Sequence, residues 1–152
     1  MRCFSFCSSN TLIRSKARYS EAFPHIQQLN FCRGAQLINV VLGGTLHQDI
    51  RNIRQHTYNR PGLLPTKQVK ISPESKLAGI FKKHRLRVNS LHHQAINSTG
   101  KGLQIVGRDL DEIIQAVESD HHKIIATQWH PEYLVYLPSQ FALFRWLVKN
   151  SR

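Results

Sequence analysis

The chain has 152 residues, of which 41% are hydrophobic, and this suits one globular domain with a packed core. No apolar run approaches the roughly 18 residues of a membrane span, so a soluble protein is expected. Lysine and arginine outnumber aspartate and glutamate by 21 to 9, a net charge of +12, but the basic residues are scattered and carry no nucleic-acid motif, so nucleic acid is not an expected partner.

The N-terminal segment differs in composition from the rest of the chain. It is rich in serine and basic residues and has no acidic residue before Glu21. This composition is similar to that of an organelle transit peptide, and equally to that of an unstructured tail. We therefore assign residues 1–24 to a separate segment, with disorder as one interpretation, and residues 25–152 to the folded domain.

Hydrophobic patterning predicts an alternation of helices and strands after residue 25. We expect a short strand within residues 25–31 and a buried helix over residues 35–42, ended by Gly43 and Gly44. Residues 51–67 contain several chain breakers and are predicted to form a loop. The later elements are predicted to be strands at 68–71, 85–89, 103–106, 113–117 and 123–128, with helices at 73–81, where Pro73 lies in the first turn, and at 139–149. This order indicates an α/β sandwich.

Cysteine and histidine spacing bears on the compartment and on metal binding. Cys3, Cys7 and Cys32 are an odd number without metal-type spacing, which argues against a disulfide framework and favours the reducing cytoplasm. The adjacent histidines at 92–93 and 121–122 would point opposite ways on an extended segment, so neither pair is expected to hold one metal ion.

Cys32 lies where the first predicted strand turns into the first predicted helix, as in a nucleophile elbow. Unpaired N–H groups at the helix start are expected to favour the thiolate. The backbone N–H of Arg33 is placed to donate to an oxyanion, and Gly34 leaves room for a tight turn. By itself the Cys-Arg-Gly segment fits a buried structural cysteine as well.

His130 follows a predicted strand that ends in Trp129 and precedes a proline, so it is expected on a rigid loop at a sheet edge. Its neutral imidazole could take the thiol proton, while Glu132 accepts from the other ring nitrogen. A thiol, a base and an acid that orients the base are the parts of a cysteine hydrolase. A surface histidine in a turn is the alternative.

Four segments follow one another in the chain: Cys-Arg-Gly-Ala-Gln at 32–36, Leu-Gly-Gly-Thr-Leu-His at 42–47, Val-Asn-Ser-Leu-His-His-Gln at 88–94 and Gln-Trp-His-Pro-Glu at 128–132. Together they resemble the class I glutamine amidotransferase superfamily, and within it the peptidase C26 branch of γ-glutamyl-γ-aminobutyrate hydrolase-like proteins. The resemblance runs from about Phe31 to the C-terminus. It implies the three-layer α/β sandwich of that superfamily, lacking part of its N-terminal half.

The resemblance implies a Cys-His-Glu triad of Cys32, His130 and Glu132 that cleaves a γ-glutamyl amide through a γ-glutamyl thioester. The products would be glutamate and an amine, or ammonia if glutamine is the substrate. No metal or organic cofactor is implied. The substrate-binding positions fall at Gly34, Gln36, His93 and Gln94.

Two departures from the family pattern affect the expected activity. The family elbow reads Gly-x-Cys-x-Gly, but Asn30 occupies the first position, and we expect its side chain to distort the turn. Family members also have a long N-terminal half with central strands and a second oxyanion donor, so we expect a truncated chain, which a partner chain could complete. A catalytically inactive remnant and a basic nucleic-acid-associated protein remain as alternatives to the hydrolase.

Overall fold

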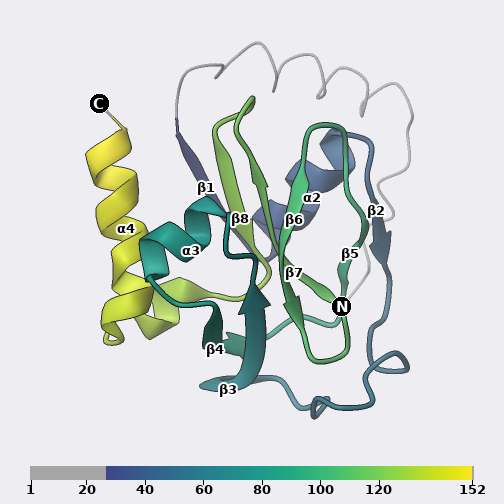
Figure 1. Ribbon diagram of the computed structural model, residues 1–152. Helices are drawn as coiled ribbons and strands as arrows, with labels where there is room; N and C mark the ends of the chain where they lie inside the picture. The colour runs from purple at the N-terminus through teal and green to yellow at the C-terminus, as the bar shows by residue number, and fades with distance from the viewer. Residues whose placement is uncertain (1–26, 152) are drawn as a thin grey trace.

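A computed structural model describes residues 27–151 of the protein, so the predictions for residues 1–24 lie outside the described part. Between residues 27 and 151, no helix combines the length and apolar character needed to cross a membrane. In chain order the elements are β1 (Gln28–Phe31), α2 (Arg33–Val41), β2 (Thr45–His47), β3 (Gly62–Ile71), α3 (Lys76–Phe81), β4 (Arg85–Ser90), β5 (Ala95–Ser98), β6 (Gln104–Asp109), β7 (Ile114–Ser119), β8 (Ile124–Thr127), the 3-10 helix η1 (Pro131–Leu134) and α4 (Pro138–Asn150) (Figure 1).

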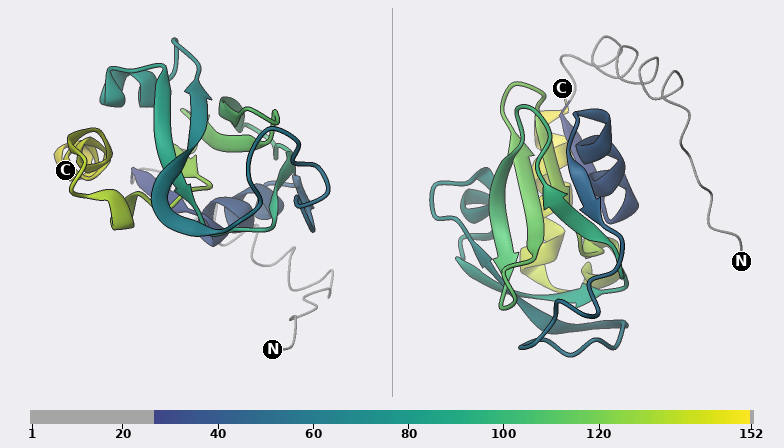
Figure 2. Two further views of the ribbon diagram at one scale, coloured as in Figure 1. Left: turned by 90° about the horizontal axis from the view of Figure 1, so that it is seen from below. Right: turned by 90° about the vertical axis from the view of Figure 1, so that its right-hand side faces the viewer.

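One mixed sheet forms the middle of the molecule. Its strands run in the order β1-β8-β7-β6-β3-β4, and β5 attaches β2 to β7. The pair β1–β8 is parallel, and the other pairs in the described part of the chain are antiparallel. The sheet curls towards β3 and β4, with α2 on one face and α3 and α4 on the other (Figure 2).

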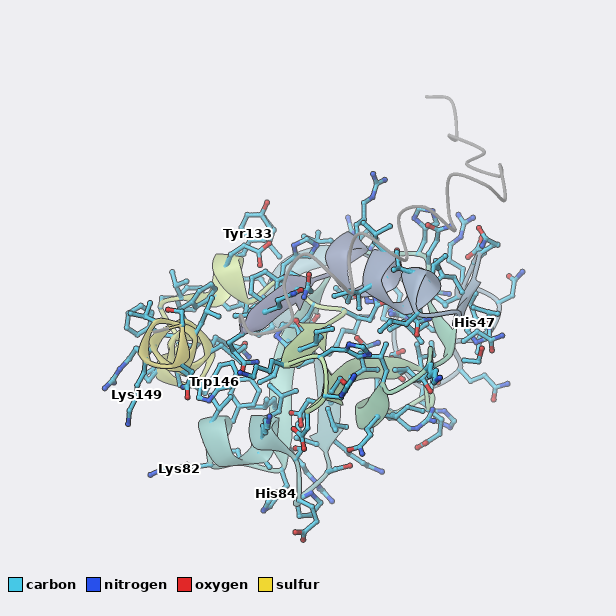
Figure 3. The ribbon with its side chains drawn as sticks, turned by 90° about the horizontal axis from the view of Figure 1, so that it is seen from above. His47, Lys82, His84, Tyr133, Trp146 and Lys149 are labelled. Atoms are coloured by element: carbon cyan, nitrogen blue, oxygen red, sulfur yellow. The ribbon has the colours of Figure 1, made fainter. Side chains whose placement is uncertain are left out.

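Strand alternation divides the apolar residues between the two faces of the sheet. Ile125 points to a core that includes Leu77 of α3 and Leu143 of α4. Trp146 of α4 lies on the side of that helix facing α3 and packs against this core (Figure 3). Its neighbour Ile124 points to a second core beneath Ile38 of α2. The predicted three-layer α/β sandwich is thereby confirmed.

The loop predicted over residues 51–67 is wrong in its last third, because β3 begins at Gly62. Pro65 lies inside β3, where the pairing with β4 is interrupted between Gly62 and Lys67. A proline without an N–H is tolerated at such an irregularity because no regular ladder bond is lost. The short strands β2 and β5 were also not predicted, since three or four residues are too few to show a clear alternation.

Helix α3 begins later than predicted. Its N-cap is Ser75, whose Oγ accepts a hydrogen bond from the N–H of Ala78 at 3.0 Å. Pro73 therefore precedes the helix instead of lying in its first turn. The serine satisfies one of the free N–H groups at the helix start, and this local bond decides where the helix begins.

Candidate active site

Cys32 lies in the sharp turn from β1 into α2, with φ 43° and ψ −104°. Side-chain-bearing residues rarely adopt a positive φ, because it brings Cβ close to the backbone. Two backbone bonds hold the turn: the N–H of Cys32 donates to the oxygen of Thr127 at 2.8 Å, and its oxygen accepts from the N–H of Gln36 at 3.1 Å. The backbone thus has the strained strand-to-helix turn of a nucleophile elbow, although Cys32 itself is buried, at 8% exposed.

Asn30 is accommodated next to this turn. A Cβ added to Gly34 would stand 3.5 Å from Cβ and Oδ1 of Asn30, so the glycine leaves space that the asparagine side chain approaches. The strand keeps its register with β8 from Gln28 to Phe31, so the expected distortion does not extend into β1. Within the described residues the buried Nδ2 of Asn30 has no hydrogen-bond partner, an arrangement that typically costs about 1–3 kcal/mol.

The thiol of Cys32 is held in its protonated form. Burial raises its pKa above the ordinary value of 9.0, because desolvation penalises the thiolate. The N–H and the charge of Arg33 lower the pKa, and the nearby carboxylate of Glu132 raises it. The helix start therefore acts as predicted, but burial outweighs it, and the thiol rather than the thiolate is the resting form.

His130 and Glu132 form a close pair at the start of η1. The Nδ1 atom of His130 lies 2.6 Å from Oε1 of Glu132, and the two side chains are 21% and 39% exposed. A carboxylate beside Nδ1 keeps the proton on that nitrogen and leaves Nε2 as a proton acceptor. The ring of Tyr133, which projects outward from η1 in Figure 3, lies 5.6 Å from the imidazole.

Asn89 fixes the backbone of His130, a role that sequence reasoning missed. Its Nδ2 donates to the oxygen of His130, and the N–H of His130 donates to its Oδ1, both at 2.9 Å. Alternation along β4 places Asn89 on the same face as the exposed Arg87, yet Asn89 is fully buried because η1 packs against β4. A prediction that Asn89 is buried would have indicated a role in holding other groups. The alternation along β4 predicts an exposed side chain instead, so the sequence did not reveal the contact with His130.

The parallel pairing of β1 and β8 explains how Cys32 and His130 come to the same region. The carboxyl ends of parallel neighbours lie at one edge of a sheet, where binding sites commonly form. Cys32 directly follows β1, and His130 comes three residues after Thr127, the end of β8. Glu132 is close enough for its charge to act on the thiol of Cys32.

The residues predicted to bind substrate are only partly brought together. The Nε2 atom of Gln36 donates to the oxygen of Gln94 at 3.0 Å and to Oε1 of Gln128 at 3.3 Å, so it joins α2, the 92–94 loop and the end of β8. Gln94 donates from its own Nε2 to Oε1 of Gln48 at 2.8 Å. The exposed His93 instead lines a cavity of about 320 Å³ with Arg51 and Arg54.

Comparison with known proteins identifies the family and agrees with the fold. Residues 15–132 match the Peptidase C26 family. The chain belongs to this family. This peptidase C26 chain is 37% identical to the glutamine amidotransferase-like protein YvdE of Lactococcus lactis over 108 residues. The matched region covers 68% of this chain and 45% of YvdE. The chain is 29% identical over 129 residues to the γ-glutamyl-γ-aminobutyrate hydrolase PuuD of Escherichia coli, covering 78% of this chain and 50% of PuuD.

The fold of this peptidase C26 chain is that of the class I glutamine amidotransferases. The crystal structure of a glutamine amidotransferase from Thermotoga maritima superimposes with a TM-score of 0.60 at 16% identity, covering 100% of this chain and 66% of that one. The resemblance inferred from the four motifs is thereby confirmed. The chain spans about half the length of the curated relatives it matches.

Proposed function

We propose that this peptidase C26 chain hydrolyses a γ-glutamyl amide, with Cys32 as nucleophile, His130 as base and Glu132 as the acid that orients it. One observation carries the proposal: a cysteine in a strained turn after β1 lies beside the end of β8, which leads into a hydrogen-bonded histidine–glutamate pair. Similarity to PuuD, a γ-glutamyl-γ-aminobutyrate hydrolase, supports the choice of a γ-glutamyl substrate.

The first half of the proposed reaction forms a thioester. Nε2 of His130 takes the thiol proton as Sγ of Cys32 attacks the side-chain carbonyl carbon of the substrate. Because burial raises the pKa of the thiol, proton transfer accompanies the attack instead of preceding it. The N–H of Arg33 donates to the oxyanion. The C–N bond then breaks, and His130 returns the proton to the departing amine.

The second half releases glutamate. His130 takes a proton from water, whose oxygen attacks the thioester carbon, and the sulfur leaves and regains that proton. In this scheme the glutamyl group lies over Gly34 and is contacted by Gln36 and Gln94. Every proton and electron pair moves between these residues, water and substrate, so the scheme uses no cofactor.

The edge of β1 supports a further part of the proposal, a partner chain. Because Cys32 donates its N–H to β8, alternation turns the backbone groups of Leu29 and Phe31 to the opposite edge, which no strand within residues 27–151 covers. An added strand there would complete the sheet and bring a second oxyanion donor near the elbow. Hydrogen exchange as slow at Leu29 and Phe31 as at Cys32 in the purified chain would contradict an open edge.

Covalent labelling tests the hydrolase proposal. A chloroketone analogue of glutamine should alkylate Cys32, and peptide mass spectrometry should locate the adduct. Cys32→Ser should abolish the labelling, and Glu132→Gln should slow it because the imidazole loses its partner. If no adduct forms between pH 6 and 9, although iodoacetamide modifies Cys32 in the denatured chain, the proposal fails and the chain is an inactive member of the family.

A further inference from the structure

A second cavity, of about 570 Å³, lies between the 56–61 loop and the strands β3 and β4, and none of the residues proposed for catalysis lines it. Its volume is within the range of small-molecule sites. The wall carries three basic side chains, and no aspartate or glutamate is among the lining residues. The basic residues are Arg60, Lys67 and Arg87.

Lys67 is the most informative residue of this wall. Alternation along β3 places it on the same face as the core residues Val69 and Ile71, and it is only 7% exposed. Within the described residues no hydrogen bond or ion pair reaches its ammonium group. Its Nζ atom is not one of the fully enclosed polar atoms without a partner in residues 27–151, and Lys67 lines the cavity, so an anionic ligand there can approach the ammonium group.

The carboxylates nearest to Lys67 are engaged elsewhere. Asp111 accepts from the backbone N–H groups of residues 55–57, at 2.9, 2.6 and 2.9 Å. Asp109 accepts from the N–H groups of Asp111 and Ile113 and from Nε2 of Gln115. Their charges act on Lys67, but burial and the charge of Arg54 lower the pKa of Lys67 below its ordinary value.

The same cavity has an apolar wall. Leu63 and Leu64 at the start of β3 are 54% and 68% exposed, and Tyr58 and Leu110 are exposed beside them. Large apolar side chains grouped at a cavity are characteristic of binding surfaces. An apolar surface next to a cation without a direct ion pair in the described residues is complementary to a ligand with both an apolar body and a negative charge.

We propose that this cavity binds a small organic anion, a carboxylate or sulfonate carried on an apolar body. The anionic group pairs with the ammonium of Lys67, which has no direct ion pair within the described residues, and the apolar body covers Leu63 and Leu64. Arg87 and Arg60 add attraction at the more exposed part of the cavity. The site is independent of the γ-glutamyl site proposed above, because the two share no residue.

A fluorescence titration with 8-anilinonaphthalene-1-sulfonate tests the proposal on the full chain. Lys67→Met keeps the length of the side chain and removes its charge, so binding should weaken by about 10-fold or more. Lys83→Met removes an exposed lysine outside the cavity and should leave the affinity unchanged. Decanoate should displace the probe, whereas decanol, which lacks the charge, should displace it at least about 10-fold less well.

Leu64→Ser tests the apolar wall if Lys67→Met does not give a cooperative melt, because a leucine that is 68% exposed lies outside the packed core. It should weaken probe binding several-fold. Equal affinity of the wild type and Lys67→Met would overturn the proposal, as would equal losses in Lys67→Met and Lys83→Met, an unchanged affinity of Leu64→Ser, or equal displacement by decanol and decanoate. Chloroketone labelling of Cys32 provides a separate readout, so failure of one site does not imply failure of the other.

Discussion

His92 should make the stability of the protein fall in weak acid. Its Nδ1 lies 2.8 Å from the backbone oxygen of Gln94, so the neutral imidazole can donate to that carbonyl. Burial lowers the pKa of His92 from 6.5 to about 4, and the charges of Arg54 and His130 act in the same direction. The hydrogen bond to Gln94 opposes this shift but does not cancel it.

The sign follows from proton binding in the two states. Between pH 4 and 6.5 the folded protein binds fewer protons at His92 than the unfolded chain does, so the free energy of unfolding rises with pH in this window. The contribution is fully present above 6.5 and is lost as the pH falls towards 4. The interval from 6.5 to about 4, at about 1.36 kcal/mol per pKa unit, corresponds to about 3 kcal/mol.

The assay is urea unfolding from pH 4 to 8, followed by fluorescence, for the wild type and His92→Gln. Burial also raises the pKa of Asp109 and Glu118, so only the difference between the two proteins isolates His92. The advantage of the wild type should shrink by about 3 kcal/mol as the pH falls from 8 to 4. His84→Gln, at an exposed histidine, controls for the loss of an imidazole. Parallel curves for the wild type and His92→Gln would refute the reasoning.

Three further changes test local contacts. Asn89→Leu removes both bonds to the backbone of His130 and should lower the free energy of urea unfolding by about 2–4 kcal/mol and slow chloroketone labelling; a loss below about 1 kcal/mol would contradict this. Ser75→Ala should cost about 1 kcal/mol in the same assay because the N-cap bond is lost, and an unchanged unfolding midpoint would count against the cap. Asp111→Asn weakens the acceptor of the N–H groups of residues 55–57, so limited trypsinolysis in that loop should accelerate. An unchanged cleavage rate would argue that these hydrogen bonds do not hold the loop.

Local patterns predicted the elements that are long or clearly bounded. Helix α4 follows from apolar residues at helical spacing, and α2 follows from a buried run that ends where Gly43 adopts a φ of 93°. Patterns failed where length or pairing decides the structure. The extension of β3 past Pro65 depends on an interrupted ladder with β4, and the strands β2 and β5 are too short to show a period.

By itself, the sequence determined which reactive groups exist and which local structures carry them. Cys32 follows a strand and precedes a helix, Glu132 lies two residues beyond His130, and four ordered motifs indicated the peptidase C26 family. These properties depend on neighbours in the chain, and local patterns therefore reveal them.

Only the tertiary structure decided how those groups are placed and charged. The parallel pairing of β1 with β8 brings the turn at Cys32 beside the end of the strand that leads to His130, and η1 buries Asn89 so that it can hold the histidine backbone. Burial then reverses the expected ionisation of Cys32 and leaves the ammonium of Lys67 without a partner in the described structure. Desolvation and long-range contacts arise from residues distant in sequence, so no local pattern contains them.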